Sequence, residues 1–120
     1  MELDIIKRVY EWNEQRGLLQ KGYKKDLEAS FISEELSEFL RSDNVVDDID
    51  ALIDSVIFQL GALSKILKSE LAVKICFEAV LNANEQKGNK TDKSGKVIKD
   101  KSNFIEPQEV IKKVLQDKKG

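Results

Sequence analysis

Two groups of acidic side chains stand close together in the sequence, within segments whose other residues follow an amphipathic helical pattern. Their members are Glu34, Glu35, Glu38, Asp47, Asp50 and Asp54. Carboxylates spaced three, four or seven residues apart share one face of a helix. If the two helices pack antiparallel through a short connection, the carboxylates converge on one small volume, which is unfavourable without a counter-ion. Because carboxylate oxygens select hard cations over zinc, the pattern predicts a magnesium site in which Mn²⁺ can substitute.

The directions of the two acidic faces support this interpretation. At about 100° per residue, the three glutamates continue an apolar stripe that holds Leu27 and Phe31. The three aspartates border the apolar side of the following helix, next to Ile53 and Val56. Like-charged carboxylates at the edge of a core either raise one another's pKa or recruit a cation, because desolvation and repulsion both disfavour ionisation.

Each acidic group alone also has an ordinary structural explanation. Glu-Glu-x-x-Glu is common on solvated helix faces, because Glu is a good helix former. Asp43 or Asn44 can cap the second helix, and the aspartates of its first turn then suit the helix dipole. Asp50 and Asp54 lie too far inside that helix for this explanation, so the two groups together favour a site. The chain has no His and a single Cys, which excludes a zinc site.

Composition sets the class of protein that we expect. The chain of 120 residues fits one domain spanning residues 1–120, and 41% hydrophobic against 35% charged residues is ordinary for a soluble globular protein. A net charge of −2 argues against a nucleic-acid binder, whose affinity comes largely from a basic surface. No apolar run approaches about 18 residues and the start lacks a signal pattern, so we expect a cytoplasmic protein without a membrane segment. Cys76 stands in an apolar run and is expected to be a small core residue.

Hydrophobic periodicity predicts an all-α fold with four main helices. They are expected at residues 3–16, 24–41, 45–68 and 70–86. A lysine-rich loop follows over residues 87–96, then a short extended piece at 97–99. Pro107 suits the first turn of a short C-terminal helix that ends near residue 116. The expected architecture is a four-helix-bundle-like core, with the lysine-rich loop between it and the C-terminal helix.

The lysine-rich loop supplies the charge that a phosphate ligand needs. A solvated loop is the ordinary explanation for Lys90, Lys93 and Lys101. The segment, however, follows a helix end that carries Asn82, Asn84 and Lys87, and it continues through Lys96 and Lys99. Carboxylates, a divalent cation and nearby ammonium groups together make a triphosphate site, in which Lys neutralises the oxygens that the metal does not touch. No Walker-type glycine loop occurs, so the chemistry would rest on metal and acid.

Four blocks in this order resemble a known superfamily. They are Glu34-Glu35-Leu36-Ser37-Glu38, the segment VDDIDALIDSVIF at 46–58, Asn82-Ala83-Asn84-Glu85-Gln86-Lys87, and Gly95-Lys96 through Phe104 to Pro107. Over residues 5–107 the chain is similar to the all-α nucleotide pyrophosphohydrolases, most closely to the MazG-like and phosphoribosyl-ATP-pyrophosphohydrolase-like branch.

The resemblance implies a helical bundle that forms a homodimer, or a dimer of dimers. It also implies magnesium-dependent hydrolysis of a nucleoside triphosphate to the monophosphate and pyrophosphate. In that family the Glu-x-x-Glu pair and the acids of the next helix bind the metal, which here points to Glu35, Glu38 and Asp54. Many members have Glu-x-x-Asp in the second block, where this chain has Ala51. Asp50 is one residue earlier and can substitute, which leaves the fourth ligand and the number of metal ions open.

A mechanism follows from the groups available. Magnesium would bind phosphate oxygens and a water, and Glu34 or Glu35, whichever is not ligated, would orient or deprotonate that water. Asn84, Lys87, Lys96 and Lys99 would contact the nucleotide phosphates. Trp12 and Asn13 are candidates for stacking on the base and reading its edge. The alternative for Trp12 is a core position, and the alternative for Asn13 is simple exposure.

Two rival functions differ in chemistry. The first is a non-catalytic helical interaction module whose acidic surface docks a basic partner, and it predicts no response to magnesium. The second is a di-metal oxidase, which needs His ligands that this chain lacks. Among pyrophosphohydrolase functions, house-cleaning of damaged nucleotides and trimming of deoxyuridine or deoxycytidine triphosphates both remain open. Exposed apolar residues on several helix sides favour the homodimer.

Overall fold

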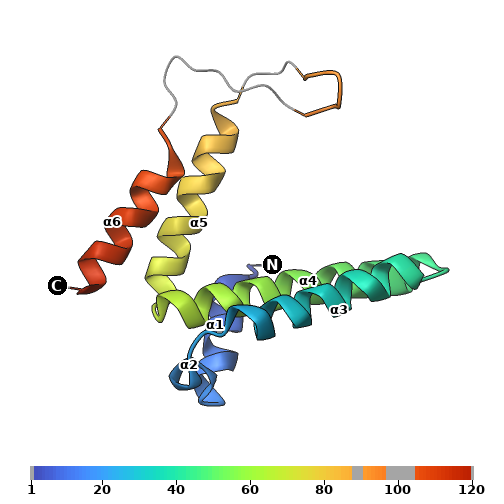
Figure 1. Ribbon diagram of the computed structural model, residues 1–120, viewed down its shortest axis with the longest axis horizontal. Helices are drawn as coiled ribbons and strands as arrows, with labels where there is room; N and C mark the ends of the chain where they lie inside the picture. The colour runs from blue at the N-terminus through green and yellow to red at the C-terminus, as the bar shows by residue number, and fades with distance from the viewer. Residues whose placement is uncertain (1, 88–90, 97–104, 120) are drawn as a thin grey trace. The chain divides into compact units, whose positions relative to one another are not determined.

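The computed structural model describes residues 2–87, 91–96 and 105–119, and this part of the chain is helical with no β-strand (Figure 1). Its helices are α1 (Ile5–Gln15), α2 (Leu18–Lys21), α3 (Lys25–Arg41), α4 (Val45–Leu67), α5 (Glu70–Glu85) and α6 (Pro107–Lys119). The all-α prediction is confirmed, and Pro107 begins the last helix as expected. The extended piece expected at 97–99 lies outside the described residues.

The chain divides into two compact units, each of which is described by itself. The N-terminal unit spans Met1–Glu70 and the C-terminal unit spans Leu71–Gly120. The N-terminal unit holds α1 to α4 and all six residues of the two acidic groups. The C-terminal unit holds α6 and all of α5 except its first residue. Across the described residues, no helix is long and apolar enough to cross a membrane.

Helices α3 and α4 form an antiparallel hairpin, because only residues 42–44 connect them (Figure 1). Asn44, one of the two residues expected to cap α4, is its N-cap. Its side chain accepts a hydrogen bond of 2.8 Å from the Asp47 backbone N–H. Asp47 and Asp48 occupy the first turn, where negative charge suits the helix dipole. At the other end, Lys68 in a left-handed conformation closes α4 and returns its N–H to the Ser64 carbonyl at 2.8 Å.

The core of the N-terminal unit lies along the C-terminal half of α4, where α1 and α2 pack. Leu60, Ser64 and Leu67 of α4 are buried there, as are Val9 of α1 and Leu19 of α2. Helix α2 is an element that hydrophobic periodicity did not predict. It is a single turn that follows Gly17, whose φ of 69° gives the left-handed bend that ends α1.

In the C-terminal unit, Val73, Cys76 and Ala83 are the buried side of α5. Burial raises the pKa of the Cys76 thiol, as expected for a core cysteine. Residues 91–96 form a tight turn in which Asp92 Oδ1 accepts hydrogen bonds from the backbone N–H groups of Ser94 and Lys96. Gly95 closes the turn with a φ of 89°. The Ser94 hydroxyl also donates a hydrogen bond of 2.6 Å to Asp92 Oδ1. This side-chain bond contributes most, and the backbone bonds contribute further, to lowering the pKa of the Asp92 carboxyl.

Candidate metal and phosphate site

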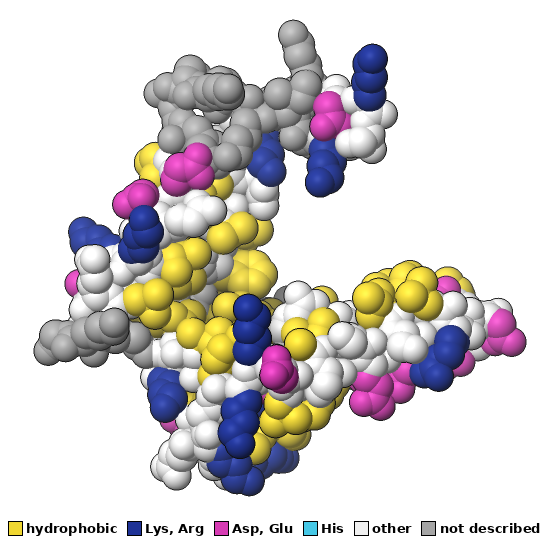
Figure 2. Space-filling view, in the orientation of Figure 1, with side chains coloured by type: hydrophobic (Ala, Val, Ile, Leu, Met, Phe, Trp, Pro, Cys, Tyr) yellow, Lys and Arg dark blue, Asp and Glu magenta, His cyan; other side chains and the backbone are white. Residues whose placement is uncertain are grey.

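An aromatic contact fixes which acidic residues face one another across the α3–α4 hairpin. The rings of Phe31 and Phe58 lie 5.4 Å apart between centroids. Glu35 is four residues after Phe31 on α3, and Asp54 is four residues before Phe58 on α4. Because the helices are antiparallel, equal steps from one contact lead to neighbouring positions, about one turn along the hairpin. This spacing places Glu35 and Asp54 on facing parts of the two helices, and the charge of Asp54 raises the pKa of Glu35. Figure 2 shows acidic side chains gathered over this hairpin.

Glu35 is the half-buried glutamate of the acidic group. Its Oε2 atom is buried and has no hydrogen-bond partner among the described residues. The pKa of its carboxyl is raised, first by desolvation and then by a side-chain hydrogen bond with Glu38, which leaves the Oε2 atom itself unpaired. The charges of Glu38, Asp54 and Glu34 raise it further. A carboxylate oxygen without a partner at this place is a position that a cation can satisfy.

Asp54 extends the same electrostatic group onto α4. Its pKa is raised by desolvation first, and then by the negative charges of Asp50 and Glu38. Glu34, Glu38 and Asp50 are exposed, whereas Glu35 and Asp54 are partly buried. The hairpin thus holds two carboxylates at the edge of its interior, with three more around them.

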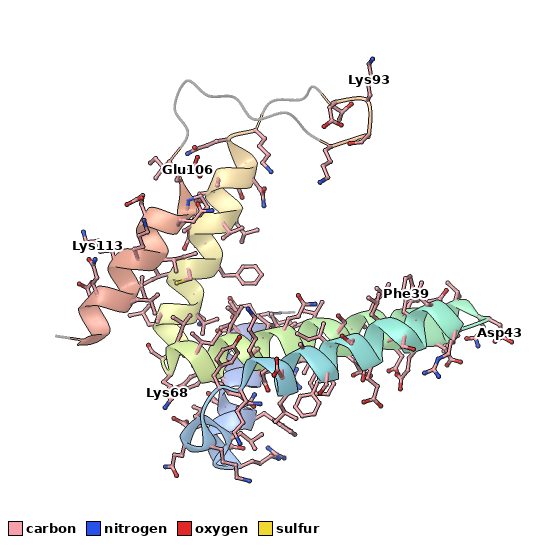
Figure 3. The ribbon with its side chains drawn as sticks, viewed as in Figure 1. Phe39, Asp43, Lys68, Lys93, Glu106 and Lys113 are labelled. Carbon is pink, nitrogen blue, oxygen red and sulfur yellow. The ribbon has the colours of Figure 1, made fainter. Side chains whose placement is uncertain are left out.

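A shallow hollow of about 290 Å³ lies beside these carboxylates, toward the turn of the hairpin that carries Asp43 in Figure 3. It is lined by Glu38, Arg41, Ser42, Asp47, Asp50 and Ala51. Ala51 is buried and stands three residues before Asp54, just as Glu38 stands three residues after Glu35. The small side chain of Ala51 therefore lines the hollow, with Asp50 next to it.

Arg41 is a lining residue that the sequence reasoning missed. Its Nε donates a hydrogen bond of 3.3 Å to the Ser37 carbonyl, and the side chain is exposed. Within the described residues, its guanidinium forms no ion pair with the carboxylates of the hollow. Its place three residues after Glu38, on the same side of α3, was the available signal.

The acidic side chains are near one another but do not form a ready-made metal cage. In the described parts of the chain, no group of three or more His, Cys, Asp or Glu side chains is arranged to hold a metal ion. A cation would draw the carboxylates of Glu35, Glu38 and Asp54 together around itself. The donor set that is present consists of oxygens alone, which suits Mg²⁺ or Mn²⁺.

On the other side of the aromatic contact, the hairpin holds a buried ion pair that the sequence reasoning also missed. Lys65 Nζ donates to both carboxylate oxygens of Glu28, at 2.7 and 3.1 Å. The same ammonium group lies 5.8 Å from the centroid of the Phe31 ring. The two residues are 37 positions apart in the sequence, and Glu and Lys are normally exposed, so no local pattern indicated the pair.

The two residues proposed to contact the base point to different sides of α1. Trp12 is 51% exposed, with the Arg16 guanidinium stacked 4.2 Å from its ring centroid, so it is not a core residue. Asn13 is buried, and its Nδ2 donates a hydrogen bond of 2.8 Å to the Val9 carbonyl. It packs at Gly61 of α4, where an added Cβ would lie 3.5 Å from Asn13 Nδ2. The exposed indole remains accessible, whereas the Asn13 amide is engaged within its own unit.

The residues proposed to contact phosphate lie in the C-terminal unit, and one of them is outside the residues that the structure describes. Asn84 is exposed near the end of α5, and Lys87 follows that helix. Lys96 is exposed in the turn of residues 91–96, which Figure 3 marks by Lys93. Lys99 lies outside the described residues. The acids and these lysines are thus in separate units.

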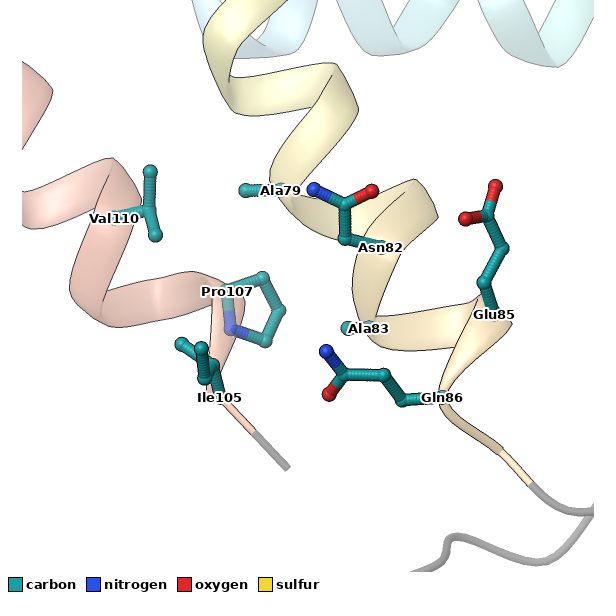
Figure 4. A pocket seen from close by; sticks show the side chains of 8 residues that line it. All are labelled: Ala79, Asn82, Ala83, Glu85, Gln86, Ile105, Pro107 and Val110. Carbon is teal, nitrogen blue, oxygen red and sulfur yellow. The ribbon is translucent and has the colours of Figure 1, made fainter. Parts of the chain in front are cut away.

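The C-terminal unit has a concave place of its own, shown in Figure 4. It measures about 270 Å³ and is lined by Ala79, Asn82, Ala83, Glu85, Gln86, Ile105, Pro107 and Val110. The lining combines apolar side chains of α5, of α6 and of Ile105 before α6 with two amides and one carboxylate. Neither Asn84 nor Lys87 lines it, which places the proposed phosphate contacts on another part of the helix surface.

Comparison with protein-family models, curated proteins and solved structures finds no match to this chain.

Proposed function

We propose that this protein is a Mg²⁺-dependent nucleoside triphosphate pyrophosphohydrolase of the MazG-like type, acting on the cytoplasmic nucleotide pool. The observation that carries the proposal is the buried Oε2 atom of Glu35, which has no hydrogen-bond partner among the described residues. Glu38 on the same helix and Asp54 on the facing helix both raise the pKa of this carboxyl. The raised pKa values of Glu35 and Asp54 indicate negative charge that a cation would relieve. Oxygen-only donors suit magnesium, and the four sequence blocks supply the family resemblance.

Each acidic residue has a role in this proposal. Glu35, Glu38, Asp50 and Asp54 would hold the metal, with Asp50 in place of the acid that many relatives have at the Ala51 position. A bound Mg²⁺ makes a water more acidic and neutralises phosphate oxygens. Glu34 is exposed and close enough to raise the pKa of Glu35, so it is the group that would accept a proton from the attacking water.

Cationic side chains would bind the phosphates that the metal leaves uncovered. Arg41 lines the hollow beside Glu38 and Asp50, and a guanidinium can bind phosphate through two parallel hydrogen bonds. The family resemblance also assigns contact with the phosphates to Asn84, Lys87, Lys96 and Lys99. Trp12, which is exposed, is the group that would stack on the base.

A homodimer is part of the proposal, with a dimer of dimers as its larger form. Helices α1 and α2 pack on α4, whose apolar stripe is buried in its C-terminal half, at Leu60 and Leu67. The same stripe continues bare toward the hairpin turn. Its exposed members include Val45, Ile49, Leu52, Ile53 and Val56. A second copy of the hairpin, which presents the same stripe, would cover it.

The test is pyrophosphate release from a panel of ribo- and deoxyribonucleoside triphosphates. Each nucleotide is assayed with Mg²⁺, with Mn²⁺ and with a chelator, for the wild type, Glu38→Gln and Asp26→Asn. Asp26 is an exposed acid in the first turn of the same helix, so its variant controls for loss of one charge. We expect metal-dependent release of pyrophosphate and monophosphate, retained in Asp26→Asn and lost in Glu38→Gln.

The interaction module gives the opposite result. It would show no turnover with any nucleotide and no rise in the melting temperature when Mg²⁺ is added. That pair of results would overturn the proposal and leave an acidic docking surface for a basic partner.

A further inference from the structure

The ion pair between Glu28 and Lys65 is buried within the α3–α4 hairpin. Its side chains are 7% and 12% exposed, and both carboxylate oxygens are engaged by one ammonium group. Placing two charges in such a setting costs desolvation, and apolar residues of similar volume commonly give equal or greater stability. A buried pair of this kind therefore calls for an explanation other than stability.

The position of the pair along the hairpin suggests that explanation. Glu28 is three residues before Phe31 on α3, and Lys65 is seven residues after Phe58 on α4. If the helices slid past each other by one turn, about 5.4 Å, apolar contacts would re-form with new neighbours. Glu28 and Lys65 would instead become unpaired charges in a buried place, which is strongly unfavourable. The ion pair thus discriminates between registers that apolar packing distinguishes poorly.

The same register decides whether the acidic residues meet. Glu35 reaches Asp54 only when α3 and α4 are aligned as the Phe31 and Phe58 rings align them. Lys65 does not contribute to the pKa shift of Glu35 or Asp54, so the pair is electrostatically separate from the acidic group. Its effect on the acids would be exerted through the alignment of the two helices.

We infer that Glu28 and Lys65 are positioning residues, whose buried ion pair fixes the axial register in which Glu35 and Glu38 of α3 face Asp54 of α4. The inference rests on the proposed function, in which those carboxylates hold the metal. It assigns to Glu28 and Lys65 no contact with metal or nucleotide.

The test uses a double variant, Glu28→Leu with Lys65→Met, in the full-length chain. This variant removes both charges and keeps apolar bulk, so we expect stability equal to or above that of the wild type. Lys65→Arg is the matched control, because it keeps an ion pair with Glu28. Two quantities are measured: Mn²⁺ affinity, from the paramagnetic resonance signal of free Mn²⁺, and the distance between spin labels at Ser33→Cys and Gln59→Cys. Both label positions are exposed, and Cys76→Ala removes the native thiol.

We expect the label distance and the Mn²⁺ affinity to change together. In the double variant the label distance should shift or its distribution should broaden, and Mn²⁺ affinity should fall about tenfold or more. Lys65→Arg should keep both wild-type values. A folded double variant with an unchanged label distance would overturn the inference, whatever its Mn²⁺ affinity, and so would a changed distance with unchanged affinity. If the wild type binds no Mn²⁺, the proposed function fails, and the label distances alone decide whether the pair sets the register.

Discussion

The ring of Phe31 on α3 meets the ring of Phe58 on α4 at 5.4 Å, and this contact separates two electrostatic environments within one hairpin. On one side, Lys65 neutralises a buried carboxylate. On the other side, one turn away, Glu35 and Asp54 lie at the edge of the interior with no cationic partner in the described residues. The difference between the two sides is the physical basis for proposing that an external cation binds the second one.

Removing the charge of Glu35 should make the metal-free protein more stable. Glu35→Gln abolishes repulsion with Glu38 and Asp54 and reduces the cost of desolvation, so its melting temperature without metal should exceed that of the wild type near pH 7. Adding Mg²⁺ should raise the melting temperature of the wild type, because a ligand that binds only the folded state stabilises it, and should raise that of Glu35→Gln much less. Differential scanning calorimetry with and without Mg²⁺ measures both effects. A lower melting temperature for metal-free Glu35→Gln would contradict the account.

The pKa of Asp54 gives a prediction on pH dependence. Because this pKa is raised on folding, the folded state holds its proton at pH values where the unfolded chain has released it. The contribution of Asp54 to the free energy of unfolding is therefore fully present below its unfolded pKa of about 4, and is lost as pH rises through the folded value. Asp54→Asn should be more stable than the wild type by a margin that grows across this window. Urea unfolding at a series of pH values measures the margin, and a margin that is independent of pH would show that folding does not raise the pKa of Asp54.

Lys65→Met alone should behave in the opposite way from the double variant. It leaves Glu28 buried without its partner, which is expected to cost about 3–5 kcal/mol of unfolding free energy near neutral pH. Chemical denaturation followed by far-ultraviolet circular dichroism measures the loss. Glu28→Leu in the same chain should restore the full loss, and an additive second loss would mean that the two side chains do not interact.

Gly61 offers a test of the packing between α1 and α4. An added Cβ would meet Asn13 Nδ2 at 3.5 Å, which is an ordinary contact, and Gly in a helix interior costs about 0.5–1 kcal/mol relative to Ala. Gly61→Ala should therefore be stabilised by about that amount in urea unfolding. A clear destabilisation would mean that Asn13 packs more tightly against α4 than the 3.5 Å approach indicates.

The sequence was sufficient for the helices because their signals are local. The apolar period of α4, its Asn44 cap and the Pro107 start are each encoded within a few residues. Helix α2 was missed because four residues are too few to establish a period. The antiparallel packing of α3 on α4 was anticipated, since a three-residue connection makes it the expected arrangement.

Other parts of the site depend on contacts that no local pattern records. The Glu28–Lys65 pair joins residues far apart in the sequence, and both residue types usually point to water. Asn13 and Trp12 are adjacent, yet one is buried and the other exposed, because α4 covers only one side of α1 at Gly61. Arg41 was overlooked because a basic residue in the last turn of a helix has an ordinary role in stabilising its dipole.

Mn²⁺ binding to the wild type and to Glu35→Gln/Asp54→Asn, followed by the resonance signal of free Mn²⁺, tests the central claim most directly. The double variant removes the two partly buried charges and is expected to fold at least as stably as the wild type, so lost binding cannot be assigned to unfolding. The account predicts that the wild type binds Mn²⁺ and that the affinity of the double variant is lower by a factor of about ten or more. Equal affinity in the two proteins, or no binding by the wild type, would contradict it.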